Sequence, residues 1–306
     1  MPAAEQPAIV IDRLTKTFGA RTAVSDVSLS IDQGEVFGFL GPNGAGKSTT
    51  LRTLLGFMRP TSGSCRVMGH DSHADTVSMH RRVGNLPSEF NLENRMTGFQ
   101  LLSLYASLRG SEPGLNHARE LAERLDADLH RPMRRLSRGN KQKIGLIQAL
   151  FHHPAVVVLD EPTGGLDPFI QEEFLSIVRE CRNRGQTVLF SSHVLNDVER
   201  VADRVGMIRD GELVAVEQPE HLAGRSWRNV RVQLAQTPDE QDIAELRALP
   251  GVEHVAVVGS VISFVVHRDV DAAIRILSRH RILQLDAERP PLEELFLKYY
   301  GRSPSK

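Results

Sequence analysis

The stretch that most constrains how this chain folds is residues 41–48, which read Gly-Pro-Asn-Gly-Ala-Gly-Lys-Ser. The spacing is G-x-x-x-x-G-K-S, and the stretch lies between an apolar run at 35–40 and a helical pattern at 48–57. A strand that runs through a glycine-rich turn into a helix suits phosphate binding, because N–H groups of the turn point inward and the helix N-terminus is electropositive. A glycine-rich turn without a ligand is the plain alternative, and the spacing and context together disfavour it.

This loop supplies the first candidate residues. We expect Lys47 to reach the β- and γ-phosphates of a bound nucleotide, and the Ser48 hydroxyl to ligate Mg²⁺. The candidate phosphate-binding residues are Gly41, Pro42, Asn43, Gly44, Ala45, Gly46, Lys47, Ser48 and Thr49.

Two acidic residues follow a second apolar run. Residues 155–159 are Ala-Val-Val-Val-Leu, and Asp160 and Glu161 come directly after them. We expect Asp160 to hold Mg²⁺ through its water shell, and Glu161, which points the other way, to polarise an attacking water. A solvated acidic strand end is the plain alternative, and the phosphate loop upstream makes it the weaker one.

Composition narrows the class of protein. Of the 306 residues, 41% are hydrophobic and 25% charged, with a formal net charge of −1, so ordered domains are expected and a dedicated nucleic-acid binder is not. Cys65 and Cys181 lack metal-ligand spacing and suit a reducing compartment. The sequence shows neither a signal-peptide pattern nor an apolar run of about 20 residues, so we expect a cytoplasmic protein without a membrane span.

Strand-like and helical patterns alternate over residues 8–225. This alternation predicts an α/β domain whose ligands bind at the carboxyl ends of the strands. The expected strands are 9–11, 24–31, 35–40, 155–159 and 187–190, and the expected helices are 48–57, 141–151 and 169–182.

Residues 228–306 predict a second, smaller α+β domain. The expected order is β-α-β-β-α-β, which is that of a ferredoxin-like unit. Gly259 and Ser260 stand between two of its strands, as is typical of a hairpin turn. The expected strands are 230–234, 251–258, 261–266 and 282–285, and the expected helices are 238–249, 269–279 and a terminal helix at 292–300.

Three further motifs select one family among the many proteins with a phosphate loop. They are Leu-Ser-Arg-Gly-Asn at 136–140, Gly-Gly-Leu-Asp at 164–167 and Ser-Ser-His at 191–193. In this order they resemble the signature, D-loop and H-loop of the ATP-binding cassette (ABC) ATPases, and the resemblance covers residues 14–217. It implies a P-loop NTPase cassette, with a mixed sheet core and a helical signature subdomain, that uses ATP and Mg²⁺.

The resemblance also implies that two copies work together. In the family, the signature binds the γ-phosphate of ATP held by the opposite subunit, so hydrolysis requires a head-to-tail dimer. Ser137 and Gly139 open a predicted helix, so their N–H groups form an anion site, and Ser137 is also expected to cap the helix. The residues carried over to the trans contact and the D-loop are Ser137, Arg138, Gly139, Asn140 and Asp167.

Within one copy, the resemblance implies that Glu161, His193 and Lys47 are the catalytic residues, with His193 contacting the γ-phosphate. Phe18 resembles the aromatic residue that stacks on adenine, a type of contact worth roughly 1–3 kcal/mol. A phenylalanine of the hydrophobic core is the alternative for Phe18.

Two regions depart from the common family pattern. Arg138 and Asn140 replace the usual glycine and glutamine of the signature, and this change leaves the backbone donors in place. Ser88 stands where the Q-loop glutamine normally contacts Mg²⁺, and a serine is too short to reach as far. We expect Glu89 or an additional water to substitute, so Glu89 joins the candidate Mg²⁺ ligands Ser48 and Asp160.

These departures resemble one branch of the family. Residues 86–89, 96–98 and 291–296 resemble the bacterial drug-resistance and antibiotic-efflux exporters of the ABC-2 type, whose ATPase and membrane subunits are separate chains. The expected protein energises export of a hydrophobic compound or drug through a separate transmembrane permease. It would bind that permease at the inner face of the cell membrane.

Three other functions remain open. An importer ATPase with a regulatory C-terminal domain would more often keep the Q-loop glutamine that Ser88 replaces. A soluble ABC ATPase acting on ribosomes or DNA would carry two cassettes or a long coiled coil, whereas this chain has one phosphate loop and no sustained heptads over 47–136. A non-hydrolysing module would lack the base, which is present as Glu161. The C-terminal domain is expected to support dimerisation or docking.

Overall fold

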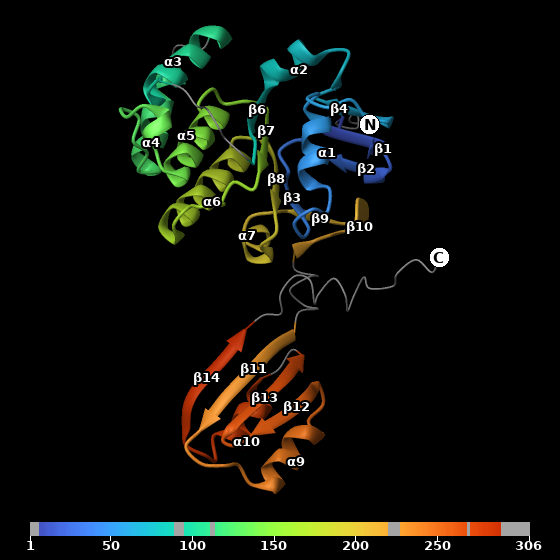
Figure 1. Ribbon diagram of the computed structural model, residues 1–306, viewed down its shortest axis with the longest axis vertical. Helices are drawn as coiled ribbons and strands as arrows, with labels where there is room; N and C mark the ends of the chain where they lie inside the picture. The colour runs from blue at the N-terminus through green and yellow to red at the C-terminus, as the bar shows by residue number, and fades with distance from the viewer. Residues whose placement is uncertain (1–5, 89–94, 111–113, 220–226, 268–269, 289–306) are drawn as a thin grey trace. The chain divides into compact units, whose positions relative to one another are not determined.

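The structure is a computed structural model that describes residues 6–88, 95–110, 114–219, 227–267 and 270–288. Contacts along the chain divide it into two units, Met1–Pro219 and Glu220–Lys306. The first unit contains the elements up to β10, and the second contains β11 to β14 (Figure 1).

A mostly parallel sheet forms the centre of the first unit. Its strand order is β10-β9-β3-β8-β7-β6, and within it β10 at one edge pairs antiparallel with β9 while the other pairs are parallel. Strands β3, β7 and β8 are buried at every position, as expected for strands covered on both faces. The strands are β3 (Val36–Leu40), β6 (Val83–Leu86), β7 (Val156–Asp160), β8 (Thr187–Ser192), β9 (Arg204–Arg209) and β10 (Glu212–Glu217).

An antiparallel sheet of order β2-β1-β4-β5 completes the mixed architecture that the sequence predicted. Ile9 of β1, Phe37 of β3 and Leu51 of the helix α1 belong to one buried cluster, so the two sheets and α1 share a core. The elements added here are β1 (Ile9–Phe18), β2 (Arg21–Ile31), β4 (Ser62–Val67), β5 (His70–Asp71) and α1 (Lys47–Leu54).

The predicted helical subdomain consists of α3 (Gly98–Arg109), α4 (Gly114–Arg124) and α5 (Arg138–Leu150). Figure 1 shows these three helices grouped at one side of the unit, away from β1 and β2. The other helices are α2 (Thr76–Arg82), the 3-10 helix η1 (Met133–Arg135), α6 (Pro168–Asn183) and α7 (Leu195–Glu199).

The second unit is a sheet of order β12-β13-β11-β14 in which all three strand pairs are antiparallel. Strands β12 and β13 pair directly across Gly259 and Ser260, which confirms the predicted hairpin. Val230, Val232, Phe264 and Leu277 are part of its own buried core. The elements are β11 (Trp227–Leu234), α9 (Glu240–Ala248), β12 (Val252–Val258), β13 (Val261–His267), α10 (Asp271–Leu277) and β14 (Ile282–Glu288).

Several element boundaries differ from the sequence prediction, and two of the differences bear on the site. The first strand runs to Phe18 instead of ending at residue 11. Its pairing with β2 continues through the polar residues in its middle, with shifts of register there. Helix α1 ends at Leu54 instead of 57, since Gly56 has a φ of +74° and a Cβ there would lie 2.3 Å from the carbonyl oxygen of Ser72. The predicted terminal helix at 292–300 lies outside the described residues. Of the helices that the structure describes, none is both long enough and apolar enough to cross a membrane.

We predict that His152, which follows α5, makes the first unit sensitive to acid. Burial, helped by the positive charge of Arg109, lowers the pKa of His152 from 6.5 to about 4. Between pH 6.5 and about pH 4 the unfolded chain binds a proton at His152 that the folded chain does not. The free energy of unfolding therefore falls as the pH is lowered through this range. The loss should be about 2 kcal/mol between pH 7 and pH 5.

Denaturant titrations at both pH values test this. The variant His152→Gln should lose most of the difference between them, and His130→Gln, at an exposed histidine, should keep it. An unchanged pH dependence in His152→Gln would show that another group is responsible.

Candidate active site

The phosphate loop joins the carboxyl end of β3 to α1. Gly44 and Gly46 have φ values of +82° and +108°, a left-handed backbone that favours glycine. A Cβ on Gly46 would lie 2.7 Å from the carbonyl oxygen of Ala23, so the position has no room for a side chain. The first-turn N–H groups of α1 have no acceptors within the helix. They are therefore available to an anion held in the loop.

Lys47 is buried at the start of α1, with 5% of the residue exposed, and its ammonium group lies inside the loop. Its Nζ donates to the carbonyl oxygens of Gly41 (2.6 Å) and Pro42 (3.2 Å) and lies 3.1 Å from Oε1 of Glu161. A buried ammonium group is costly unless acceptors surround it. Phosphate oxygens are also negatively charged acceptors, so they could take the place of the Glu161 carboxylate beside Lys47. The geometry therefore fits the predicted role of Lys47.

The two acids stand where β7 ends beside β8. Asp160 is 3% exposed, and its Oδ1 accepts a hydrogen bond from the Ser191 hydroxyl at 2.6 Å. The same hydroxyl oxygen accepts the backbone N–H of Glu161 at 2.9 Å. Glu161 has a φ of +50°, which takes the chain out of the strand direction. The Asp160 carboxylate and the Glu161 backbone therefore share one buried partner in Ser191, while the Glu161 carboxylate lies against Lys47.

His193 follows β8, and its Nδ1 lies 2.8 Å from Oε2 of Glu161. Glu161 thus contacts a lysine through one carboxylate oxygen and a histidine through the other. Half of the His193 side chain is exposed, so it is open to a ligand. In the helix that follows, burial raises the pKa of Asp197 against the effect of a hydrogen bond from Thr163. The three predicted catalytic residues, Glu161, His193 and Lys47, are brought into contact.

A cavity of about 490 Å³ connects this group to the end of β1. Phe18 lies at that end with 48% of the residue exposed, which excludes the alternative of a core phenylalanine. The Nζ of Lys16 lies 5.0 Å from the centre of the Phe18 ring. The cavity is lined by Phe18, Arg21, Ala23, Pro42, Asn43, Gly44, Gly46, Lys47, Ser48, Thr49, Ser88 and Glu161. Among the predicted loop residues, Gly41 and Ala45 are buried and do not line it.

The signature residues stand at the start of α5 and do not line the cavity. Ser137 caps the helix by accepting the N–H of Asn140 at 3.2 Å, and Arg138 is exposed. The Asn140 side chain accepts the N–H of Asp128 at 3.0 Å. The asparagine that replaces the usual glutamine therefore holds the preceding loop against α5.

The D-loop touches the signature within the same copy. A Cβ on Gly139 would lie 2.7 Å from the carbonyl oxygen of Gly165, which explains why a glycine stands there. Asp167 caps α6 by accepting the N–H groups of Phe169 and Ile170, both at 3.1 Å. Phe169 is 88% exposed. The signature and the D-loop thus form one continuous surface that is separate from the cavity of the same chain.

Ser88 lines the cavity, so the predicted Q-loop position does face the phosphate loop. Glu89 lies outside the described residues, and its part in Mg²⁺ binding stays a prediction.

Sequence reasoning gave no role to three residues of this region. Arg21 lines the cavity and stands three positions after Phe18. Its closeness in sequence to the predicted aromatic contact could have identified it as a site residue. In the sequence, Ser191 was used only to identify His193, although Ser191 lies on β8, which pairs with the strand that ends in Asp160. Gln142 donates to the backbone of Glu161, and a single glutamine in a helix carries no pattern that could reveal such a contact.

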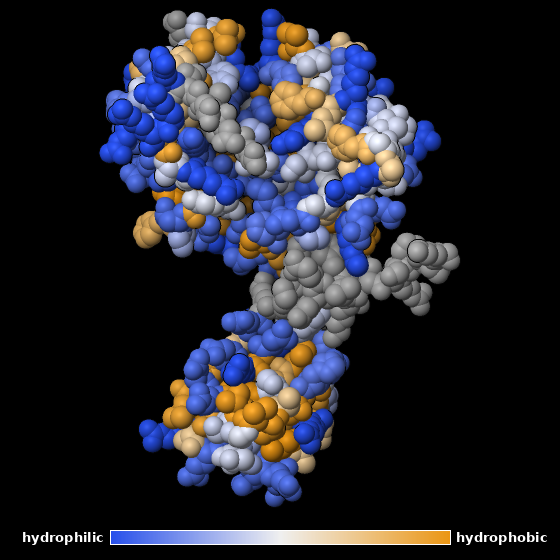
Figure 2. Space-filling view, viewed as in Figure 1, coloured by the Kyte–Doolittle hydropathy of each residue, from blue (hydrophilic) through white to orange (hydrophobic). Residues whose placement is uncertain are grey.

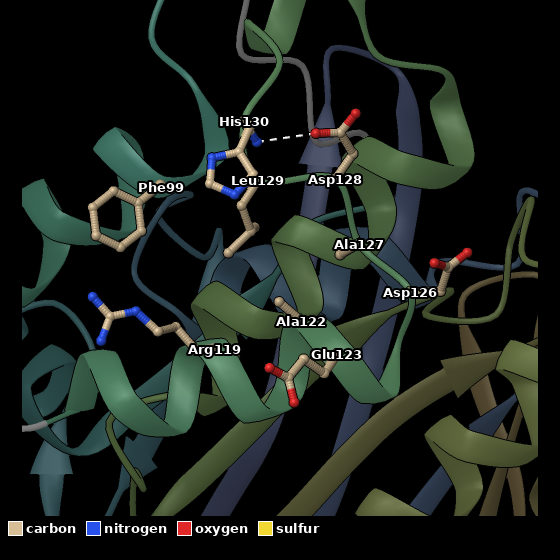
Figure 3. Close-up of a pocket in the computed structure, with 9 residues that line it drawn as sticks. All are labelled: Phe99, Arg119, Ala122, Glu123, Asp126, Ala127, Asp128, Leu129 and His130. Atoms are coloured by element: carbon tan, nitrogen blue, oxygen red, sulfur yellow. Dashed lines mark hydrogen bonds between the residues drawn. The ribbon is translucent and has the colours of Figure 1, made fainter.

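A second depression, of about 500 Å³, lies in the helical subdomain. It is lined by Phe99, Arg119, Ala122, Glu123, Asp126, Ala127, Asp128, Leu129 and His130 (Figure 3). The Arg119 guanidinium lies 5.4 Å from the centre of the Phe99 ring. None of the predicted site residues lines this depression, and no phosphate-binding turn opens into it. We place the chemistry in the first cavity.

The chain is similar to known proteins along most of its length. The family model described as ABC transporter matches residues 24–164. The linearmycin resistance ATP-binding protein of Bacillus subtilis is 31% identical over 95% of this chain and 98% of its own length. A Nod factor export ATP-binding protein of Rhizobium etli is 31% identical over 98% and 95%. A bacitracin transport ATP-binding protein of Enterococcus faecalis is 34% identical over 67% and 68%.

Solved structures show the same architecture. The structure of an ATP-binding subunit of an ABC transporter superposes with a TM-score of 0.65 at 28% identity, and the match covers 70% of this chain and 91% of that one. A bacterial ABC transporter cassette solved as a dimer gives a TM-score of 0.64 at 24% identity, with 69% and 98% covered. The second likeness supports the fold alone.

We predict that Lys47→Ala weakens ATP binding by about 10- to 100-fold, since it removes a buried charge from the phosphate loop. Equilibrium titration with a fluorescent ATP analogue measures the affinity. Arg52→Ala removes an exposed cation from the same helix and serves as the control. Affinity of Lys47→Ala within twofold of the wild type would contradict the assignment of the loop.

Proposed function

This chain belongs to the ABC transporter family as an ATP-binding subunit, and on that basis we propose that it powers export of a hydrophobic compound or drug through a separate membrane subunit. It binds and hydrolyses ATP. The observation that carries the assignment of its chemistry is the contact of Glu161 with Lys47 and His193 at the edge of the phosphate-loop cavity. The residue roles below are part of the proposal.

Glu161 is the general base. As the water oxygen attacks the γ-phosphorus, the bond from that phosphorus to the bridging oxygen breaks, which gives ADP and inorganic phosphate, and a proton of the water passes to the Glu161 carboxylate. Assistance of this kind contributes on the order of 10²–10⁴ in rate. Lys47 moves from Glu161 to the β- and γ-phosphates when they enter the loop, and His193 orients the carboxylate and contacts the γ-phosphate. Phe18 stacks on the adenine ring at the far end of the cavity.

The residues next to the phosphates fit a magnesium ion. Ser48 lines the cavity, and Asp160 provides a buried carboxylate at the carboxyl end of β7, so both supply the hard oxygen ligands that Mg²⁺ prefers. Ser48 would bind the ion directly and Asp160 through a water. The ion supplies positive charge that offsets the charge developing on the transferred phosphoryl group.

The second copy of the chain completes the site. The Ser137 cap and the D-loop lie on a surface outside their own cavity, and a separate copy placed head to tail would bring them to its nucleotide. Ser137, Arg138, Gly139, Asn140 and Asp167 would then act in trans. The exposed Phe169 is adjacent to this surface, and aromatic side chains of that kind are common at the centre of protein interfaces.

A transmembrane permease is the second partner. Exposed apolar side chains gather near α2 and α3: Phe57 is 57% exposed, Val77 72%, Leu104 44% and Leu108 73%. Figure 2 shows apolar surface at the end of the first unit where Figure 1 places these two helices. An apolar surface shared by neighbouring helices suits docking of another protein. Through this contact the chain would sit at the cytoplasmic face of the membrane.

Export is favoured over import by the relatives, whose names refer to linearmycin resistance and Nod factor export. Residues 8–225 would form the nucleotide-binding domain. Residues 228–306 would form an accessory domain of the ferredoxin-like type. The strand order β12-β13-β11-β14 and the two helices α9 and α10 support this assignment. Its role is to support dimerisation or docking.

We predict that Glu161→Gln binds ATP but stalls as an ATP-locked dimer, because the base is lost while the phosphate-binding groups remain. Gel filtration with ATP and Mg²⁺ should show the dimer, and phosphate release should fall by about 100-fold or more. Glu212→Gln, at an exposed acid, is the matched control. Turnover of Glu161→Gln at the wild-type rate would reject Glu161 as the base.

We predict that Leu108→Glu weakens permease binding while the soluble ATPase activity stays within about twofold. The measurement is a pull-down of the tagged chain from solubilised membranes, scored by recovery of a polytopic membrane protein. Val216→Glu introduces the same charge at an exposed valine of β10 and should leave co-purification intact. Equal recovery of the membrane protein with Leu108→Glu would place the docking surface elsewhere.

A further inference from the structure

Buried side chains hold the segment after β7 from two sides. From α5, Gln142 donates its Nε2 hydrogens to the carbonyl oxygens of Glu161 (3.1 Å) and Pro162 (3.2 Å), and only 5% of Gln142 is exposed. From α7, Asp197 accepts the Thr163 hydroxyl at 2.9 Å. The chain between the acidic strand and the D-loop is thus fastened to the signature helix and to the helix after His193.

The conformation of Glu161 depends on such support. Its φ of +50° lies in the left-handed region, which costs a residue other than glycine on the order of 1–3 kcal/mol and persists only where the surroundings enforce it. The Ser191 hydroxyl accepts the Glu161 N–H, and the Gln142 amide binds the two carbonyls that follow. Together these contacts fix the peptide planes on both sides of the Cα. They therefore fix the direction in which the carboxylate leaves the chain.

We propose that Gln142 is a positioning residue for hydrolysis, through which the signature helix sets the orientation of the Glu161 carboxylate of the same chain. This inference rests on the proposed function, in which Glu161 is the base and α5 meets the nucleotide of the second copy.

The position of Gln142 on α5 links the two sites. It lies five residues after Ser137, which is roughly 7.5 Å along the helix axis at 1.5 Å per residue. Because a helix moves as a unit, a displacement of its N-terminus toward the partner's nucleotide also moves the Gln142 amide. Engagement of the other chain's nucleotide by the signature helix therefore shifts the Glu161 carboxylate of the same chain.

The contact requires a side chain as long as glutamine that ends in an amide. Both hydrogens of the Nε2 group are needed, since one goes to each carbonyl oxygen. Gln142→Met keeps nearly the same length and volume without a donor. Gln142→Glu keeps the shape but turns an acceptor oxygen toward two carbonyl oxygens. Both variants remove the positioning contact in different ways, and ATP affinity measured on each shows whether it is folded.

The test compares kcat and KM for ATP in the full-length chain. Gln142→Met and Gln142→Glu should lower kcat by about 10- to 100-fold, as expected when a catalytic group is misplaced, and leave KM and ATP affinity within about twofold. The control is Gln186→Met: Gln186 is also buried and donates to the carbonyl oxygen of Pro154 at 2.6 Å, away from the site. It loses the same kind of hydrogen bond and should keep its kcat.

A second readout uses the Glu161→Gln background. Adding Gln142→Met there should leave the ATP-locked dimer unchanged, because Gln142 acts on a carboxylate that is already absent. Loss of that dimer would overturn the proposal by placing Gln142 in the dimer contact, and a kcat within twofold of the wild type in both single variants would overturn it directly. A wild-type chain without ATPase activity, or a Glu161→Gln chain that forms no dimer, would instead overturn the proposed function and the inference with it.

Discussion

The contact between the buried Lys47 ammonium and the Glu161 carboxylate is the interaction on which the site depends. An ammonium group that is 5% exposed must be surrounded by acceptors, and here they are two carbonyls of the phosphate loop and one carboxylate oxygen. This pairing is possible because β3 and β7 are parallel strands, with β8 between them, and their carboxyl ends reach one edge of the sheet. The fold thus places a cation and the base of the proposed reaction in contact.

The same contact connects substrate binding to catalysis. Phosphate oxygens would compete with Glu161 for Lys47, so an arriving nucleotide would free the carboxylate to meet water. The left-handed backbone of Glu161, held by Ser191 and Gln142, determines where the freed carboxylate points. In the proposed mechanism, substrate would control the base through Lys47, and the second copy would control it through α5. A base under both controls suits a motor that must not hydrolyse ATP before two copies have closed on it.

Much of this site was predictable from the sequence because it rests on local patterns. The phosphate loop, Asp160, Glu161 and His193 each follow an apolar strand, and parallel strands bring such ends together without further information. The contacts of Gln142 and Ser191 were not predictable, since each joins residues that are 19 to 31 positions apart by an ordinary polar side chain. Phe18 lines the cavity, and its contact with adenine stays a prediction. The full extent of its strand was missed because polar residues interrupt the apolar pattern.

Phosphate release by the purified full-length chain, measured with ATP and Mg²⁺ over a range of protein concentrations, tests whether the chain hydrolyses ATP as a head-to-tail dimer. If hydrolysis requires two copies, the rate per molecule rises with protein concentration until the head-to-tail dimer is formed. Absence of phosphate release at every concentration would contradict hydrolysis by such a dimer.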